Sequence, residues 1–462
     1  IIKATGTIHL KGGIWTSGGG GRSESRISAN ATPVVIDSGS SFTGTNTHYF
    51  VTLAAGITIT TPTANANFGT WTVDLFHGSG NGSTFKLGAN LTSTGNLILE
   101  STTALTGAIF DADTANNYTL TFPTLSVAPC APSRTGDWTM YMRGGTHTFS
   151  NTTSGIILGT DCGAHTLDMG SSTVDVKGAV ELGDGTSTIT VTPGTGTLTW
   201  THTSGSKVYT PSGETFYNIT LNCSGGTVAP GAAVIVSNDL TMTAGTLSSS
   251  SNVTVNGSTV GVAGTFSYSG SAVHEQRVAA AETFGTTSGS TNWSFVNLRF
   301  TNSAGVSATV TTNSGGSGTV TVTSVMTVGL ATDSARTVLD AGARTWTLSG
   351  TGGDPLLVDD VTTGSRITGS TSTFAYTGAN GAGNTNVENN ASATYYNLKI
   401  GGASLCTNDT YDLEGAIDVD NDLTIQACGT FDTVTGQNYG ITIGGSYVNS
   451  GALTARSGTI TF

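Results

Sequence analysis

The densest acidic stretch of the sequence is YDLEGAIDVDNDLT, in which Asp418, Asp420 and Asp422 alternate with other residues. In an extended strand alternate side chains point to the same side, so the three carboxylates would share one face. Carboxylate oxygens are ligands that Ca²⁺ prefers, which makes calcium binding one hypothesis. However, the glycine and the distal glutamate of an EF-hand loop are missing, and NDLT recurs at residues 238–241 within SNDLTM. We therefore favour a solvated strand face and keep calcium as the alternative.

Other carboxylates could take part in acid–base catalysis. They lie in the stretches GGDPLLVDD and FDAD, and two arginines flank the first of these. Polysaccharide lyases and glycoside hydrolases need clustered carboxylates, often with a basic residue nearby. The candidates are Asp111, Asp113, Arg344, Asp354, Asp359, Asp360 and Arg366. Any solenoid brings together residues that are one coil apart, so the pattern has little specificity. We expect no catalytic residue, with a polysaccharide-degrading enzyme as the alternative.

The histidines and tryptophans give no sharper indication of chemistry. The seven histidines are dispersed, and HEQRV lacks the second histidine of a zinc-protease helix. A row of exposed tryptophans could bind sugar rings, as a carbohydrate-binding adhesin would require. Alternation instead places Trp71 on the same strand face as Val73 and Leu75. Trp346 shares a face with Leu348 in the same way. We therefore expect the tryptophans in the core.

The chain has five cysteines and no CxxC pair, so a metal or thioredoxin-like site has no support. Cys406 and Cys428 are separated by about one coil of a solenoid, so a disulfide between them is one hypothesis. Cys130 and Cys162 form a second candidate pair, and Cys223 is then left over. Disulfides would fit an oxidising compartment, whereas small buried thiols are the alternative.

Composition limits the class of protein. Among 462 residues only 10% are charged and 65 are glycine, and threonine is abundant. Such a chain favours β-strands and turns. The net charge is −13 and the 16 basic residues form no cluster, which argues against nucleic-acid binding. No apolar run is long enough for a membrane helix. The chain begins with Ile1, so we expect a processed chain or a piece of a longer one. Its composition is poor in lysine and rich in Thr, Ser, Gly and Asn, which resembles that of secreted surface proteins, so we expect a location outside the cell or at its surface.

Short segments that alternate apolar residues with threonine recur throughout, separated by Gly, Asn, Asp and Ser. This period of two predicts many short strands. Three segments combine an aromatic start with an asparagine: ETFYNITL, WSFVNLRF and ATYYNLKI, which contain Asn218, Asn297 and Asn397. An asparagine suits a chain corner, so we expect each one at the start of a strand. In the third segment Leu398 and Ile400 would then point inward.

The spacing of the apolar pairs indicates how the strands are arranged. Val253 and Val255 are expected inside, and further pairs follow at Leu423/Ile425, Ile441/Ile443 and Ile460/Phe462. The latter steps of about 20 residues predict a parallel β-helix, in which every coil buries one strand face and stacks on the next. Tandem β-sandwich domains are the alternative, since their repeats are about 100 residues long.

The predicted fold is therefore all-β, a parallel β-helix (β-solenoid) with irregular loops. The stretch AVHEQRVAAAETF has a helix-like pattern and is expected to form a short helix or a protruding loop. The predicted divisions are irregular coils at 1–213, repeat units at 214–270, 293–378 and 394–462, and loop excursions at 271–292 and 379–393.

The series FYNITL, NDLTMTAGTL, NVTVNGS and GTFSYSG resembles repeats of very large bacterial and archaeal cell-surface proteins. It is also similar to β-helix adhesins and autotransporter passengers. The resemblance covers residues 214–462 and implies an extracellular stalk, filament or adhesin without catalytic residues. We expect a structural protein that self-associates head to tail, with surface carbohydrate as a further partner. We expect no cofactor apart from the calcium alternative, no nucleic acid and no membrane insertion.

Overall fold

The computed structural model describes the backbone of nine short strands between residues 8 and 77. It further describes residues 83–101, 107–127, 136–159, 163–183, 188–359, 362–379, 383–389, 391–402 and 409–462. The described regular elements are all β-strands, and no helix in this part of the chain could cross a membrane. The chain divides into two units, Ile1–Val234 and Ile235–Phe462.

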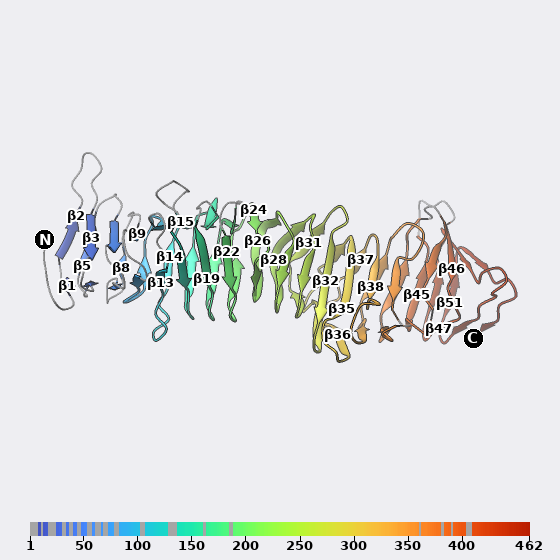
Figure 1. The fold of residues 1–462 in the computed structure, drawn as a ribbon. Coiled ribbons are helices and arrows are strands. Elements are labelled where there is room, and N and C mark those ends of the chain that lie inside the picture. The colour runs from blue at the N-terminus through green and yellow to red at the C-terminus, as the bar shows by residue number, and fades with distance from the viewer. Residues whose placement is uncertain are drawn as a thin grey trace. The chain divides into compact units, whose positions relative to one another are not determined.

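Unit 1 is built from coils of three strands, because each strand pairs in parallel with the third strand after it (Figure 1). One sheet contains β13 (Ala108–Asp111), β16 (Trp138–Tyr141), β19 (Ala164–Asp168) and β22 (Thr188–Thr192). A second series contains β14 (Leu120–Phe122), β17 (Thr146–Phe149), β20 (Thr173–Val176) and β23 (Thr197–Trp200). A third contains β15 (Leu125–Val127), β18 (Ser154–Ile157), β21 (Ala179–Glu181) and β24 (Gly205–Thr210). This arrangement is a parallel β-helix.

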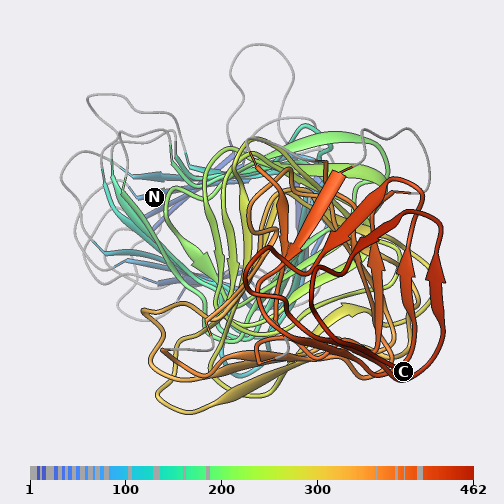
Figure 2. The ribbon, with the colours of Figure 1, turned by 90° about the vertical axis from the view of Figure 1, so that its right-hand side faces the viewer.

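Unit 2 repeats the principle with longer and less regular coils, which wrap around their interior in Figure 2. One sheet contains β29 (Val253–Val255), β32 (Val273–Val278), β35 (Asn297–Asn302), β38 (Met326–Val328) and β41 (Leu356–Val358). A second contains β34 (Trp293–Phe295), β37 (Val320–Val322), β40 (Thr345–Leu348), β43 (Thr373–Tyr376), β45 (Asn397–Ile400), β48 (Leu423–Ile425) and β51 (Tyr447–Asn449). A third series contains β28 (Leu240–Ser249), β30 (Thr259–Gly261), β31 (Thr265–Tyr268), β33 (Glu282–Thr286), β36 (Ala308–Thr312), β39 (Thr337–Asp340) and β42 (Arg366–Thr368).

Two small sheets complete the last coils of unit 2. One contains β44 (Thr385–Val387), β46 (Asp409–Leu413), β49 (Gly429–Asp432) and β52 (Ala452–Thr454). The other contains β47 (Ile417–Val419), β50 (Ile441–Ile443) and β53 (Ile460–Thr461). All of their pairings are parallel, so the predicted all-β, parallel β-helical fold is confirmed.

The core is formed by the inward face of each strand, as the period of two predicted. Val253, Val255, Leu423, Ile425, Ile441 and Ile443 are all buried. Rings from successive coils stack inside unit 2: Trp346 and Phe374 lie with centroids 6.2 Å apart and planes inclined by 9°. Such rings bury large apolar areas and contribute additional ring–ring attraction. The tryptophans predicted in the core are buried wherever their side chains are described, at Trp138, Trp200, Trp293 and Trp346.

The recurring asparagines link successive coils at the corners. Asn397 accepts the Asp422 backbone N–H at 3.3 Å and the Asn421 side-chain amide at 2.9 Å, both from the next coil. Its own amide donates to the Thr373 hydroxyl of the preceding coil at 3.3 Å. Asn297 acts similarly, since it accepts the Val325 N–H. The three asparagines each begin a strand, as predicted, and the side chains of Asn297 and Asn397 satisfy backbone N–H groups of the next coil.

The structure corrects the predicted step between two of the apolar pairs. Leu423 pairs with Tyr447, and Ile441 pairs with Ile417, so the step from Leu423 to Ile441 is not one coil. Leu423 and Ile425 lie on one sheet, and Ile441 and Ile443 lie on another, because the chain turns a corner between the two pairs. Ile441 and Ile460 do lie on adjacent coils, as predicted.

Segment 271–292, expected to be a loop or short helix, instead contributes β32 and β33 to the sheets. Its alternating pattern in AVHEQRV buries His274 and Gln276 among the coils. Segment 379–393 likewise contributes β44 where it is described. Both segments carry polar residues at inward positions, so their sequences lack the regular apolar alternation that predicts a strand.

Candidate functional site

The proposed calcium ligands are not brought together on one strand face. Asp418 lies exposed on β47, Asp420 follows that strand, and Asp422 precedes β48 on a different sheet. The chain turns between β47 and β48, so the alternation that would align the carboxylates is interrupted. Asp422 instead accepts the backbone N–H of Ser446 at 2.9 Å. Within the described ranges, no group of three or more His, Cys, Asp or Glu side chains is arranged to hold a metal ion.

The carboxylates of FDAD have basic partners in the same unit. Asp111 receives two hydrogen bonds from the Arg143 guanidinium, at 2.8 and 3.1 Å. Asp113 lies 3.4 Å from the Lys86 ammonium nitrogen. The hydrogen bonds that Arg143 donates to Asp111 raise the pKa of Arg143 above its ordinary value. Both carboxylates therefore have a structural role in joining adjacent coils, which does not require catalysis.

Arg344 lies inside the solenoid and cannot assist a surface carboxylate. Its side chain is buried, and the guanidinium donates to the Thr286 hydroxyl and carbonyl and to the Gly318 and Asn313 carbonyls. Burial lowers its pKa from the ordinary value. The guanidinium thus satisfies three carbonyl groups from two coils, and these charge-assisted bonds offset part of the cost of burying the charge.

The remaining catalytic candidates around GGDPLLVDD are not assembled into one group. The Asp359 carboxylate accepts the Thr362 N–H, and the Asp359 backbone carbonyl accepts the Thr363 hydroxyl, both within the same turn. Arg366 is exposed on β42, and Asp360 lies outside the described residues. Among these candidates, only Asp354 interacts with a second carboxyl group, that of Glu414, which the sequence did not indicate.

Asp354 shares an amide donor with Glu414 across two coils. The Asn386 side-chain amide donates to Asp354 at 2.5 Å and to Glu414 at 3.3 Å. Partial desolvation raises the pKa of Glu414 to about 7, with further increases from the charges of Glu388 and Asp354 and a hydrogen bond to Asp354. The pair can therefore hold one proton near neutral pH, which is a property that general acids share.

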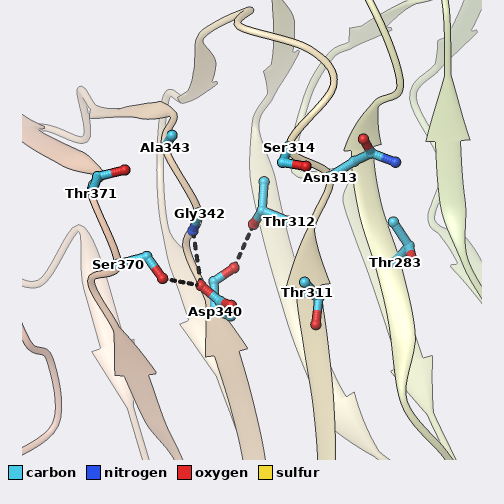
Figure 3. Close-up of a pocket in the computed structure, with 10 residues that line it drawn as sticks. All are labelled: Thr283, Thr311, Thr312, Asn313, Ser314, Asp340, Gly342, Ala343, Ser370 and Thr371. Atoms are coloured by element: carbon cyan, nitrogen blue, oxygen red, sulfur yellow. Dashed lines mark hydrogen bonds between the residues drawn. The ribbon is translucent and has the colours of Figure 1, made fainter.

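A hydroxyl-lined groove of about 470 Å³ lies on the outer face of β33, β36 and β39 and reaches the turn after β42 (Figure 3). Thr283 is in register with Thr311, and Thr311 with Asp340, so the three side chains form one row across neighbouring coils. The turns after these strands supply the second side of the groove. The lining residues are Thr283, Thr311, Thr312, Asn313, Ser314, Asp340, Gly342, Ala343, Ser370 and Thr371.

Cys428 is disulfide-bonded. The candidate cysteines Cys130, Cys162 and Cys406 lie outside the described residues, so the predicted pairing stays a prediction. Cys223, the predicted remaining thiol, is buried, and its sulfur lies 3.8 Å from the Gly226 carbonyl oxygen.

Comparison with known protein families, curated proteins and solved structures finds no match for this chain. Arguments about its function therefore depend on its own geometry. Sequence reasoning missed Glu414, Asn386 and the row through Thr311. No local signal indicated them, because they meet only through the coil register.

Proposed function

We propose that this chain is an extracellular structural protein: a β-solenoid segment of a cell-surface filament, stalk or sheath, with adhesion as a further role. The observation that carries the proposal is the uniform stacking of coil on coil. Each coil of unit 2 presents backbone groups and apolar side chains that the next coil covers, and the asparagine corners repeat along the stack. A second copy that stacks head to tail would extend the same pattern.

The coil formed by β51, β52 and β53 is the last one that the structure describes, and a further coil, in this chain or in a second copy, would stack on it. It pairs with the preceding coil through β48, β49 and β50. Tyr447 and Leu453 of this coil are register partners of buried Leu423 and Phe431, so they lie on the inward strand face. The ring centroids of Tyr447 and Phe462 are 5.9 Å apart. A disulfide at Cys428 supports an oxidising location outside the cell.

Electron microscopy and light scattering of the purified chain at increasing concentration test this proposal. We expect filaments whose growth depends on concentration. The change Leu453→Lys should prevent growth, because Leu453 is the register partner of buried Phe431 and the change introduces a charge into the stacking surface. The matched control is Val448→Lys in the same coil, because Val448 is 50% exposed and is in register with Thr424 on the outer strand face. A chain that stays monomeric at every concentration, or that loses assembly equally in both variants, contradicts the proposal.

A second candidate function is cleavage of a polysaccharide, and the Asp354–Glu414 pair is the observation that favours it. A carboxyl group that keeps its proton near neutral pH can donate it to a leaving oxygen. Release of reducing ends from purified polysaccharides would support this function, provided that Glu414→Gln abolishes the release. The absence of release from every polysaccharide tested leaves the structural role as the better account.

A further inference from the structure

We infer that the groove across β33, β36 and β39 binds a neutral oligosaccharide lying along the coil axis. This inference goes beyond the structural role and does not depend on filament growth. It concerns the row formed by Thr283, Thr311 and Asp340, together with the turns beside it. Figure 3 shows these side chains on successive strands, with the turn residues Gly342 and Ser370 next to Asp340.

The first argument is spacing. Parallel strands lie about 4.8 Å apart, so each coil adds one outward side chain to the row at a constant interval. The ligand groups that match such a row must recur along a chain, as the hydroxyl groups of a linear glycan do. Because the row crosses neighbouring coils, a ligand would extend along the stack instead of along one strand.

The second argument is the supply of hydrogen-bonding groups. Asp340 is held in place, since its Oδ1 accepts the Ser370 hydroxyl at 2.7 Å and the Gly342 N–H at 3.1 Å. The hydroxyl groups of Thr283, Thr311 and Thr371 have no hydrogen-bond partner within the described part of the chain. A hydroxyl both donates and accepts, and so does each sugar hydroxyl, so the two sets can pair in either direction.

The third argument concerns charge. Asp340 gives the lining a negative charge, and the lining contains no lysine or arginine. Arg344 lies next to the lining residue Ala343, but it is buried and its terminal nitrogens already donate to protein oxygens. An acidic glycan or a phosphate would therefore meet a carboxylate and no cation among the lining residues, since the exposed Arg366 of β42 is not one of them, and this disfavours anions. These observations select an uncharged polyhydroxyl ligand.

The experiment uses the full chain kept below its assembly concentration, so that binding is measured apart from filament growth. Cellohexaose, maltohexaose, laminarihexaose and xylohexaose are the neutral probes, and hexagalacturonate is the acidic probe. Calorimetry or saturation-transfer NMR gives the dissociation constants. We expect at least one neutral probe to bind with a dissociation constant of about 1 mM or tighter, which a few hydrogen bonds can supply. Hexagalacturonate should bind more weakly than that probe.

A double variant locates the binding. Thr283→Val with Thr311→Val keeps the shape and strand preference of both side chains and removes two hydroxyls. Binding should weaken about tenfold, the loss expected for two neutral hydrogen bonds of ordinary strength. The matched control changes Thr321 and Thr347 to valine; these residues are register partners on another sheet of the same unit. The control should change binding less than about twofold.

Three results would overturn the inference: no neutral probe binds at about 10 mM, the groove and control variants weaken binding equally, or the acidic probe binds best. Circular dichroism of both variants checks that the fold is retained. The single change Asp340→Asn provides a second measurement, because it keeps an acceptor for Ser370 while removing the charge. It should leave neutral binding within about threefold and strengthen the binding of hexagalacturonate. Filament growth is scored separately, so either proposal can fail alone.

Discussion

Acidification should weaken the centre of unit 2 through one buried histidine. His274 on β32 is fully buried, and its ring contacts Phe266 and Phe295 with centroids 5.1 and 5.0 Å away. Its nitrogens pair with the Tyr268 hydroxyl at 2.8 Å and the Thr259 hydroxyl at 3.2 Å. Burial lowers the pKa of His274 to about 3. An unfolded histidine has a pKa of about 6.5.

The sign of the effect follows from proton binding. Above about pH 6.5 the histidine is neutral in both states and makes no pH-dependent contribution. Between about pH 6.5 and pH 3 the unfolded chain binds a proton that folded His274 does not, so acid favours unfolding. The two pKa values give a loss of about 2 kcal/mol in the free energy of unfolding between pH 7 and pH 5. Below about pH 3 both states are protonated and the loss reaches its limit of about 5 kcal/mol.

The measurement is hydrogen exchange of the segment around β29, β32 and β35, because a long repeat fold need not unfold as one unit. The variant His274→Gln keeps a polar side chain and removes the titration. It is expected to be less stable than the natural chain at pH 7, since the hydroxyls of Tyr268 and Thr259 lose their ring partner.

The difference in local stability between the two chains should shrink by about 2 kcal/mol from pH 7 to pH 5. A difference that stays constant across this range would refute the reasoning, because it would mean that His274 does not resist protonation. Carboxylates other than those near His274 titrate equally in both chains, so they cancel in the comparison.

Further changes test the corners, the buried arginine and the paired carboxyls. Asn397→Ala removes three bonds between coils and should lower the local free energy of unfolding by about 2–3 kcal/mol in hydrogen exchange. Asn449→Ala removes one bond within a single coil and should cost less than about 1 kcal/mol. Gly285→Ala should lower the melting temperature more than Gly289→Ala: both glycines have positive φ, but a Cβ at Gly285 would lie 3.1 Å from Arg344 Nε, whereas nothing lies within 4 Å at Gly289. Desolvation raises the pKa of Glu414 in the folded chain, so this group stabilises the fold below its unfolded pKa. That stabilisation is lost as the pH rises through about 7. Glu414→Gln should therefore melt higher than the natural chain at alkaline pH and equally near pH 4; equal melting at both pH values would contradict the carboxyl pairing.

Strand patterns could be predicted from sequence because the alternation of side chains is local. Leu398 and Ile400 point inward and Lys399 lies at the surface, as that alternation requires. Asn397 was placed correctly at a strand start, yet its bonds to two neighbouring coils required the coil register.

The candidate sites could not be predicted because coil length varies. Ile441 and its partner Ile460 are 19 residues apart, whereas Met326 and its partner Leu356 are 30 apart. Corner insertions change which residues become neighbours without disturbing the strand pattern. The meeting of Asp354 with Glu414 is set by such insertions, so sequence spacing alone did not reveal it.

The asparagine corners also determine how the stack would bear a mechanical load. Their bonds run from one coil to the next, in the same direction as the backbone bonds between strands. A pull applied across the ends of the stack would stretch the bonds of an end coil first and release that coil before its neighbours. Extension should then proceed in steps, and each step should add the contour length of one unravelled coil. The variable coil lengths would give these steps unequal sizes, in the order in which the corners open.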